Sequence, residues 1–131
     1  MKNIVEKLSN LKTTNEEIDK LVKFIAHVDS YNPKFYEEDQ KFDVEIFRQV
    51  WAEASQLRKK GQLLKLCDQI RCPVVAIHGD YDPHPYQGVQ KPLSNIIKIF
   101  KFILLKNCGH TPWIEKNARD EFYKMLELEL T

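Results

Sequence analysis

The sequence predicts an α/β fold, in which a helical N-terminal half precedes a β-α-β-α unit. Three observations lead to this prediction. Apolar residues recur at helical spacing through residues 1–66. Beyond Pro73, two short and continuous apolar runs, Val74–Ile77 and Phe100–Leu105, are typical of strands buried on both faces. A loop and a helical pattern follow each run, so strands and helices alternate through residues 67–131. We treat the two halves as parts of one compact unit.

The helical half begins with two amphipathic patterns. In the first, apolar residues recur at positions 4, 5, 8 and 11. The segment Thr14–Glu17 then forms a capping box, in which a hydroxyl is followed three residues later by a carboxylate. Behind this box, one apolar stripe predicts a helix: Ile18, Leu21, Val22, Ile25 and Val28.

A polar loop over residues 29–41 separates this helix from a third one. Asp43 can cap the third helix. Its apolar stripe includes Trp51, which we interpret as a core residue or, alternatively, as part of a substrate pocket. Gly61 ends the helix, and residues 62–67 add another turn or two.

The second half places a short helix, Val89–Ile97, between the two predicted strands, and a final helix capped by Asn117 after them. Parallel strands joined by a right-handed helical crossover are the expected geometry. In such sheets, functional groups lie on loops at the carboxyl ends of the strands. The two loops at these positions contain most of the chemically interesting polar residues of the chain.

The first of these loops is His78–His84, and the second is Cys108–Trp113. If the strands are adjacent and parallel, both loops lie at one edge of the sheet. An aspartate of the first loop can then reach an imidazole of the second. Such a contact fixes the tautomer of the histidine and stabilises its protonated form, as in the acid and base of a hydrolytic triad.

At this point the residues resemble a known family. Ile70–Asp82 is similar to the penultimate strand and acid loop of α/β-hydrolases, and Gly109–Glu115 is similar to their histidine loop. Asp82 and His110 are 28 positions apart, which suits the intervening helix and strand. The final helix, with Asp120–Tyr123, also resembles the last helix of the family. The resemblance extends from residue 70 to the end and is weaker over the first half, which would match the cap of the family.

The resemblance implies that Asp82 is the orienting acid and His110 the general base, with Asp80 the less suitable acid. It also implies hydrolysis of an ester, amide or related acyl bond through a serine acyl-enzyme, without a cofactor. We expect a carboxylate oxygen of Asp82 to lie within about 3.5 Å of an imidazole nitrogen of His110. The simpler alternatives are a turn or capping aspartate before Pro83 and a loop histidine that donates to a backbone carbonyl.

The chain departs from the family at the nucleophile. It lacks the Gly-x-Ser-x-Gly elbow on a strand-to-helix turn, and the oxyanion loop is missing with it. Its serines do not follow an apolar strand: Ser9, Ser30, Ser55 and Ser94. Whether the chain is an enzyme is therefore uncertain. We expect a C-terminal hydrolase portion that is inactive alone or, alternatively, a non-catalytic oligomerising or binding protein.

Three other candidate functions are weighed against structural ones. His78, Asp80, Asp82 and His84 alternate as metal ligands could, but a glycine and a proline break the segment, so we predict no metal site. Cys108 and His110 could form a thiol–base pair, but a cysteine at the end of a buried strand is usually a core residue. Trp113, after the histidine loop, is a candidate substrate-binding residue.

Composition bounds the partners and the compartment. Lys plus Arg number 20 and Asp plus Glu 19, a net charge of +1 that favours neither a nucleic-acid nor a polybasic membrane partner. No apolar stretch has the length of a membrane span. Three cysteines are too few and odd in number for a disulfide framework, which suits the reducing cytoplasm.

The predicted sheet also bears on assembly. Two parallel strands form a poor independent sheet, and the strand at Val74–Ile77 would leave one edge without a partner. We therefore expect a homodimer, or a complex with a separate N-terminal hydrolase half, rather than a stable monomer.

Overall fold

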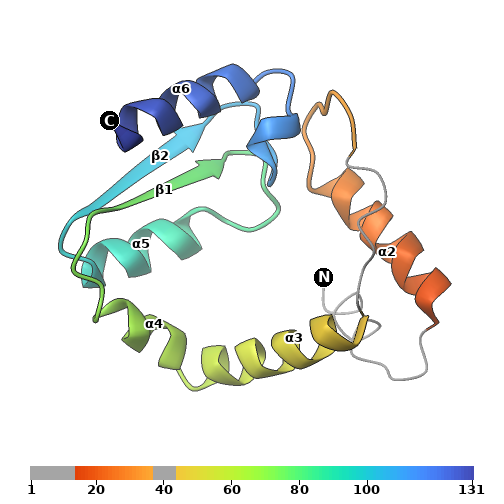
Figure 1. Ribbon diagram of the computed structural model, residues 1–131, viewed down its shortest axis with the longest axis horizontal. Coiled ribbons are helices and arrows are strands. Elements are labelled where there is room, and N and C mark those ends of the chain that lie inside the picture. Colours follow the sequence, from red (N-terminus) through yellow and green to blue (C-terminus); the bar gives the residue numbers. More distant parts are fainter. Residues whose placement is uncertain (1–13, 37–43) are drawn as a thin grey trace.

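The chain is a mixed structure of helices around a small parallel sheet, as the computed structural model in Figure 1 shows. The structure describes residues 14–36 and 44–131. The helical pattern predicted over residues 4–11 and the predicted cap at Asp43 lie outside them. The described elements are α2 (Asn15–Val28), α3 (Val44–Lys59), α4 (Gln62–Cys67), β1 (Val74–Gly79), α5 (Gln87–Ile96), β2 (Phe100–Leu105), the 3-10 helix η1 (Pro112–Ile114) and α6 (Arg119–Leu130).

The capping box at the start of α2 is confirmed. The Thr14 hydroxyl accepts the Glu17 backbone N–H at 3.3 Å, and the Glu17 carboxylate accepts the Thr14 backbone N–H at 2.9 Å. Ile18, the first residue of the predicted stripe, is fully buried, whereas Val28 at the far end is exposed. The stripe is therefore covered over only part of its length.

The third helix, α3, ends near the predicted position. Gly61, between α3 and α4, has φ +66°, a left-handed conformation that glycine adopts without steric cost. The interpretation of Trp51 as a core residue is wrong, because its side chain is 38% exposed and lies under the Arg58 guanidinium. Figure 1 shows the reason: α3 lies on the side of the molecule away from the sheet, so the sheet does not cover it.

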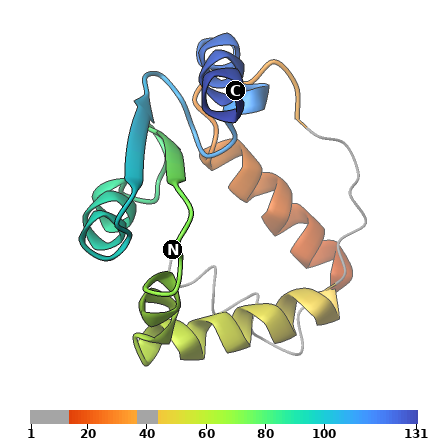
Figure 2. The ribbon, with the colours of Figure 1, turned by 60° about the vertical axis from the view of Figure 1, so that its left-hand side comes forward.

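The two strands pair in parallel, as predicted. The register runs from Val74 opposite Phe100 to Gly79 opposite Leu105. Helix α5 connects the strands, and Figures 1 and 2 show α5 and α6 on opposite sides of the sheet. The carboxyl ends of both strands therefore meet at one edge, where their loops can form a site.

The expectation that both strands are buried on both faces is wrong for this chain, since in β2 only Leu105 is buried and Lys101 is exposed. Of the residues of β1, only Gly79 is buried, and the others are half-buried. The described sheet has two strands, which are too few to form a sheet that is buried completely on both faces. The buried core lies behind the carboxyl end of β2, where Leu105, Cys108 and Ala118 pack together with Phe122.

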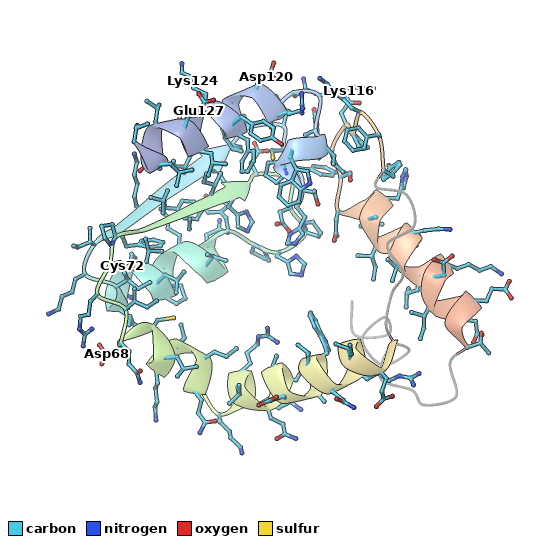
Figure 3. All side chains as sticks on the ribbon, viewed as in Figure 1. Asp68, Cys72, Lys116, Asp120, Lys124 and Glu127 are labelled. Atoms are coloured by element: carbon cyan, nitrogen blue, oxygen red, sulfur yellow. The ribbon has the colours of Figure 1, made fainter. Side chains whose placement is uncertain are left out.

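The last helix begins later than predicted, and Asn117 does not cap it. Helix α6 starts at Arg119, and its N-terminus has no side-chain cap. The Asn117 amide oxygen instead accepts a hydrogen bond from Asn32 Nδ2 at 3.3 Å, because the loop after α2 lies beside it. Figure 3 shows charged side chains of α6 pointing away from the sheet, at Asp120, Lys124 and Glu127, with Lys116 in the segment before the helix.

No helix among residues 14–36 and 44–131 is both long and apolar enough to cross a membrane.

Candidate active site

The loops after β1 and β2 are held together by backbone contacts. Asp80 N–H donates to the Leu105 carbonyl, and Tyr81 N–H donates to the Cys108 carbonyl, both at 2.9 Å. Gly79 is required for this approach, because a Cβ at that position would lie 2.2 Å from the Cys108 carbonyl oxygen. The sequence thus places the first loop directly against the second.

Asp82 and His110 meet at this edge. Asp82 Oδ2 lies 2.7 Å from His110 Nδ1, which confirms the predicted approach of the two side chains. An ionised carboxylate can only accept hydrogen bonds, so Nδ1 carries the proton and donates it. The lone pair of the imidazole is then on Nε2, as in the base of a hydrolytic triad.

The environment of Asp82 favours its ionised form. Burial of the carboxyl, whose side chain is 4% exposed, raises its pKa. The His84 backbone N–H and the imidazoles of His110 and His84 donate to the carboxylate and together hold the pKa below its usual value. Asp82 therefore remains a hydrogen-bond acceptor for His110 at neutral pH.

Asp80 contacts other groups, which agrees with the expectation that Asp82 and not Asp80 orients His110. Asp80 Oδ1 accepts the Cys108 backbone N–H at 3.4 Å, and Oδ2 lies 3.6 Å from the Lys106 ammonium. Asp80 thus fastens the second loop to the first and leaves His110 to Asp82.

The backbone of the histidine loop is fixed by the loop after α2. His110 N–H donates to the Asp29 carbonyl at 2.7 Å. Burial raises the pKa of the Asp29 carboxyl, although electrostatic interactions with His110 and His84 oppose this shift. Residues from the two halves of the chain are therefore brought together at His110.

Glu115 is a positioning residue that the sequence argument missed. Its carboxylate is fully buried and accepts three backbone N–H groups, from Tyr31 at 2.6 Å, Asn32 at 2.7 Å and Gly109 at 2.9 Å. It joins the loop after α2 to the residue that precedes His110. The sequence signal is that Glu115 directly follows the apolar residues Trp113 and Ile114, because a carboxylate that is buried beside apolar residues requires hydrogen-bond partners.

Two further imidazoles lie at Asp82, contrary to the expectation that the break at Pro83 separates Asp82 from His84. The chain turns at Pro83, and the His84 N–H donates to Asp82 Oδ1 at 2.8 Å, as in an Asx-turn. This turn brings His84 Nδ1 to 3.0 Å from the same oxygen. His78 Nε2 lies 3.6 Å from Asp82 Oδ2.

Cys108 is a core residue, as the sequence predicts. Its side chain is fully buried. Burial, together with the negative charges of Glu115 and the nearby aspartates, raises the pKa of its thiol to about 12. The thiol stays protonated at neutral pH and cannot serve as a nucleophile.

Trp113 lies in η1, three residues after His110. Its side chain is exposed, and its ring packs against Phe122 with 6.0 Å between the ring centroids. A role in substrate binding stays a prediction.

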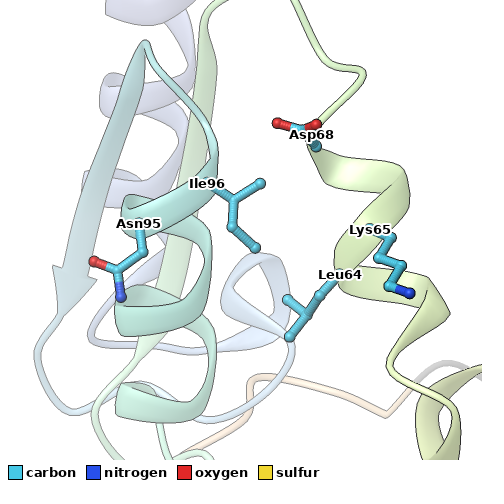
Figure 4. A pocket seen from close by; sticks show the side chains of 5 residues that line it. All are labelled: Leu64, Lys65, Asp68, Asn95 and Ile96. Atoms are coloured by element: carbon cyan, nitrogen blue, oxygen red, sulfur yellow. The ribbon is translucent and has the colours of Figure 1, made fainter.

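A hollow elsewhere on the surface is unrelated to these groups. Figure 4 shows it between α4 and the C-terminal end of α5, lined by Leu64, Lys65, Asp68, Asn95 and Ile96. The C-terminal end of α5 leads into the start of β2, so the hollow lies at the opposite end of the sheet from Asp82 and His110.

Comparison with known proteins gives no match: no protein-family model, no curated protein and no solved structure matches the chain.

Proposed function

We propose that this chain is the C-terminal portion of an α/β-hydrolase-type fold and supplies the acid and the histidine of an acyl-hydrolysis site. The observation that carries the proposal is the contact of Asp82 Oδ2 with His110 Nδ1 at 2.7 Å. The position of both residues on loops at the carboxyl ends of parallel strands supports it.

In this proposal the two side chains have different roles in one proton transfer. Asp82 holds His110 in the tautomer whose Nε2 has the lone pair. Nε2 accepts the proton of an attacking hydroxyl and then gives it to the leaving group of an ester or amide substrate. The parts of the site that determine specificity would bind the small-molecule substrate.

The nucleophile of this proposal comes from a polypeptide segment other than the residues described. Ser30 packs against the histidine loop, since its Cα lies 2.8 Å from where a Cβ on Gly109 would stand. Its hydroxyl, however, donates to the Ala26 carbonyl at 2.8 Å, within α2. Ser30 is therefore occupied as a structural residue.

Two features support completion by a further polypeptide. In the part of the chain that the structure describes, no strand pairs with the outer edge of β1. Large apolar side chains are also exposed on three helices: Phe24 and Val28 on α2, Ile46, Val50 and Trp51 on α3, and Leu64 and Leu66 on α4. Exposed apolar surface and unpaired strand edges both favour association.

The test joins a binding measurement to an activity measurement. The tagged chain is isolated from its source cells, and any polypeptide that accompanies it is treated with a fluorophosphonate probe and with p-nitrophenyl esters. We expect the accompanying polypeptide to be labelled on a serine and the complex to hydrolyse esters. The chain alone should do neither, because it lacks the nucleophile.

Matched variants identify the contribution of this chain. His110→Asn should keep the complex but abolish turnover, whereas His27→Asn, which changes an exposed histidine of α2, should keep both. Hydrolysis that survives His110→Asn and Asp82→Asn, or stoichiometric serine labelling of the isolated chain with turnover, would contradict the proposal.

The second candidate function is a non-catalytic oligomerising or binding protein in the cytoplasm. The exposed apolar side chains of α2 and α3 favour it, since a homodimer would cover them. The three cysteines are free, which suits a reducing compartment. In that case the tagged chain would copurify only with its own copies, and no serine would be labelled.

A further inference from the structure

The carboxylate of Asp82 is surrounded by imidazole nitrogens. His84 Nδ1 lies 3.0 Å from Oδ1, and His110 Nδ1 lies 2.7 Å from Oδ2. One ligand atom from each of the three residues lies within 4.8 Å of the other two. The rings of His84 and His110 are 5.4 Å apart between centroids, so both face the same carboxylate.

A third imidazole nitrogen, on His78, faces the same carboxylate. His78 Nδ1 lies 2.8 Å from the Gly79 carbonyl oxygen and donates its proton there. The lone pair of this neutral imidazole is then on Nε2, which lies 3.6 Å from Asp82 Oδ2. Two electron-pair donors thus face each other, an arrangement that a shared cation stabilises. The backbone hydrogen bond at Nδ1 is also the contact that orients histidine ligands in metal sites.

We propose that Asp82, His84 and His110 bind one Zn²⁺ ion, with His78 as the fourth ligand. Zn²⁺ prefers four nitrogen, oxygen or sulfur ligands in a tetrahedron, at about 2.0–2.1 Å from the metal. Such bonds place neighbouring ligand atoms about 3.3 Å apart. His110 Nδ1 lies 2.7 Å from Asp82 Oδ2 and His84 Nδ1 lies 3.0 Å from Asp82 Oδ1, both close to this value. His78 is outside the group whose ligand atoms all lie within 4.8 Å of one another, so its side chain must move further to join them.

The surroundings suit a divalent cation. Asp82 and His78 are nearly buried, with side chains 4% and 11% exposed, and can hold the ion from within. The His84 and His110 side chains are 55% exposed and leave a path from solvent. The nearby Asp29 carboxyl interacts electrostatically with both exposed imidazoles and with Asp82, and adds negative potential.

The zinc site does not require the proposed hydrolase function. If the chain has both properties, zinc binding and acyl hydrolysis compete for the same atoms. A Zn²⁺ ion bound to His110 Nδ1 takes the place of the proton that Nδ1 donates to Asp82, and the neutral imidazole then carries its proton on Nε2. The imidazole then no longer presents a lone pair at Nε2. The zinc-bound chain would therefore be an inhibited form of the acyl-hydrolysis site.

The test is titration of the full chain with Zn²⁺ in competition with a chromophoric chelator, and with Co²⁺, whose visible spectrum reports tetrahedral coordination. We expect one equivalent bound. His84→Asn should weaken Zn²⁺ binding at least about tenfold. His84 is exposed, so the variant should fold, which circular dichroism checks.

Two control variants separate this site from other ligands on the chain. His27→Asn removes a histidine of α2 whose Nδ1 contacts the Tyr36 hydroxyl, and Cys72→Ser removes the exposed thiol. Both variants should still bind one equivalent of Zn²⁺. The proposal is overturned if the unmodified chain binds no equivalent, if His84→Asn binds Zn²⁺ as tightly as the unmodified chain, or if Cys72→Ser loses the ion.

Discussion

At the scale of single residues, the edge of the sheet depends on buried carboxylates that accept hydrogen bonds. Asp82 accepts from two imidazoles and a backbone N–H, and Glu115 accepts from three backbone N–H groups. A carboxylate bound in this way is stabilised in its charged form despite burial. The two residues therefore have different roles: Asp82 orients the side chain of His110, and Glu115 fixes the backbone before it.

Glu115→Gln should destabilise the fold by about 2 kcal/mol. The amide nitrogen of glutamine would replace the carboxylate oxygen that accepts the Asn32 N–H, so one hydrogen bond to a charged group is lost and two donors face each other. Urea unfolding measures the change. Glu127→Gln, on the exposed face of α6 in Figure 3, is the control and should change stability by less than about 0.5 kcal/mol. Equal effects of the two variants would remove Glu115 from its positioning role.

Cys72 and Cys108 should differ in reactivity. Cys72 is exposed in the segment before β1, as Figure 3 shows, whereas Cys108 is buried and has a pKa raised to about 12. Since the thiolate is the reactive form, iodoacetamide at pH 8 should modify Cys72 rapidly and leave Cys108 unmodified while the chain is folded. Peptide mass spectrometry with and without denaturant decides this. Modification of Cys108 in the folded chain at the rate of Cys72 would refute the burial.

At the scale of elements, the candidate site depends on the close packing of three loops. The loop after α2 and the loops after β1 and β2 approach so closely that Gly79 and Gly109 have no room for a side chain. The helical half is thereby joined to the sheet at the histidine loop, although α3 lies away from the sheet (Figure 1).

Gly109→Ala should separate α2 from the histidine loop. Its Cβ would lie 2.1 Å from the Asp29 carbonyl oxygen, a backbone atom that cannot yield without moving the loop. We expect a loss of about 1–3 kcal/mol in unfolding free energy and faster hydrogen exchange at the His110 amide, which donates to that carbonyl.

Gly88→Ala is the matched control for this change. Gly88 lies in α5, and a Cβ there would meet nothing within 4 Å. Alanine has the higher helix propensity, so this variant should be neutral or more stable by up to about 1 kcal/mol. If Gly109→Ala behaved in the same way, the tight approach to Asp29 would be wrong.

At the scale of the whole molecule, the chain leaves much of its apolar surface exposed. Its described sheet has two strands, and large apolar residues of α2, α3 and α4 are exposed to solvent. A surface of this kind favours association with another polypeptide or a second copy. Assembly is therefore a property to test directly.

Light scattering of the purified chain should give a mass of twice the 15.5 kDa of one chain, or larger in a complex. Val50→Glu should weaken the association, because Val50 is exposed on α3 and a charge there opposes apolar contact without disturbing the core. Lys124→Ala, on the outer face of α6, should leave the association unchanged. A folded species of 15.5 kDa at micromolar concentration would contradict the prediction.

The sequence by itself determined the order and type of the described α-helices and strands, because their signals are local, whereas the 3-10 helix η1 begins where a loop was predicted. The capping box before α2, the glycine after α3 and the two β-branched or apolar runs depend on neighbouring residues alone. The meeting of Asp82 with His110 was also predictable, since parallel strands bring the loops after them to one edge.

Only the tertiary structure decided the burial and the partners of individual side chains. The exposure of Trp51, the buried contacts of Glu115 and the approach of His84 to Asp82 depend on segments that are distant in sequence or on a turn at Pro83. Local periodicity states which face of a helix is apolar but not whether another element covers it. That difference is why the elements followed from the sequence, whereas the cluster around Asp82 required the fold.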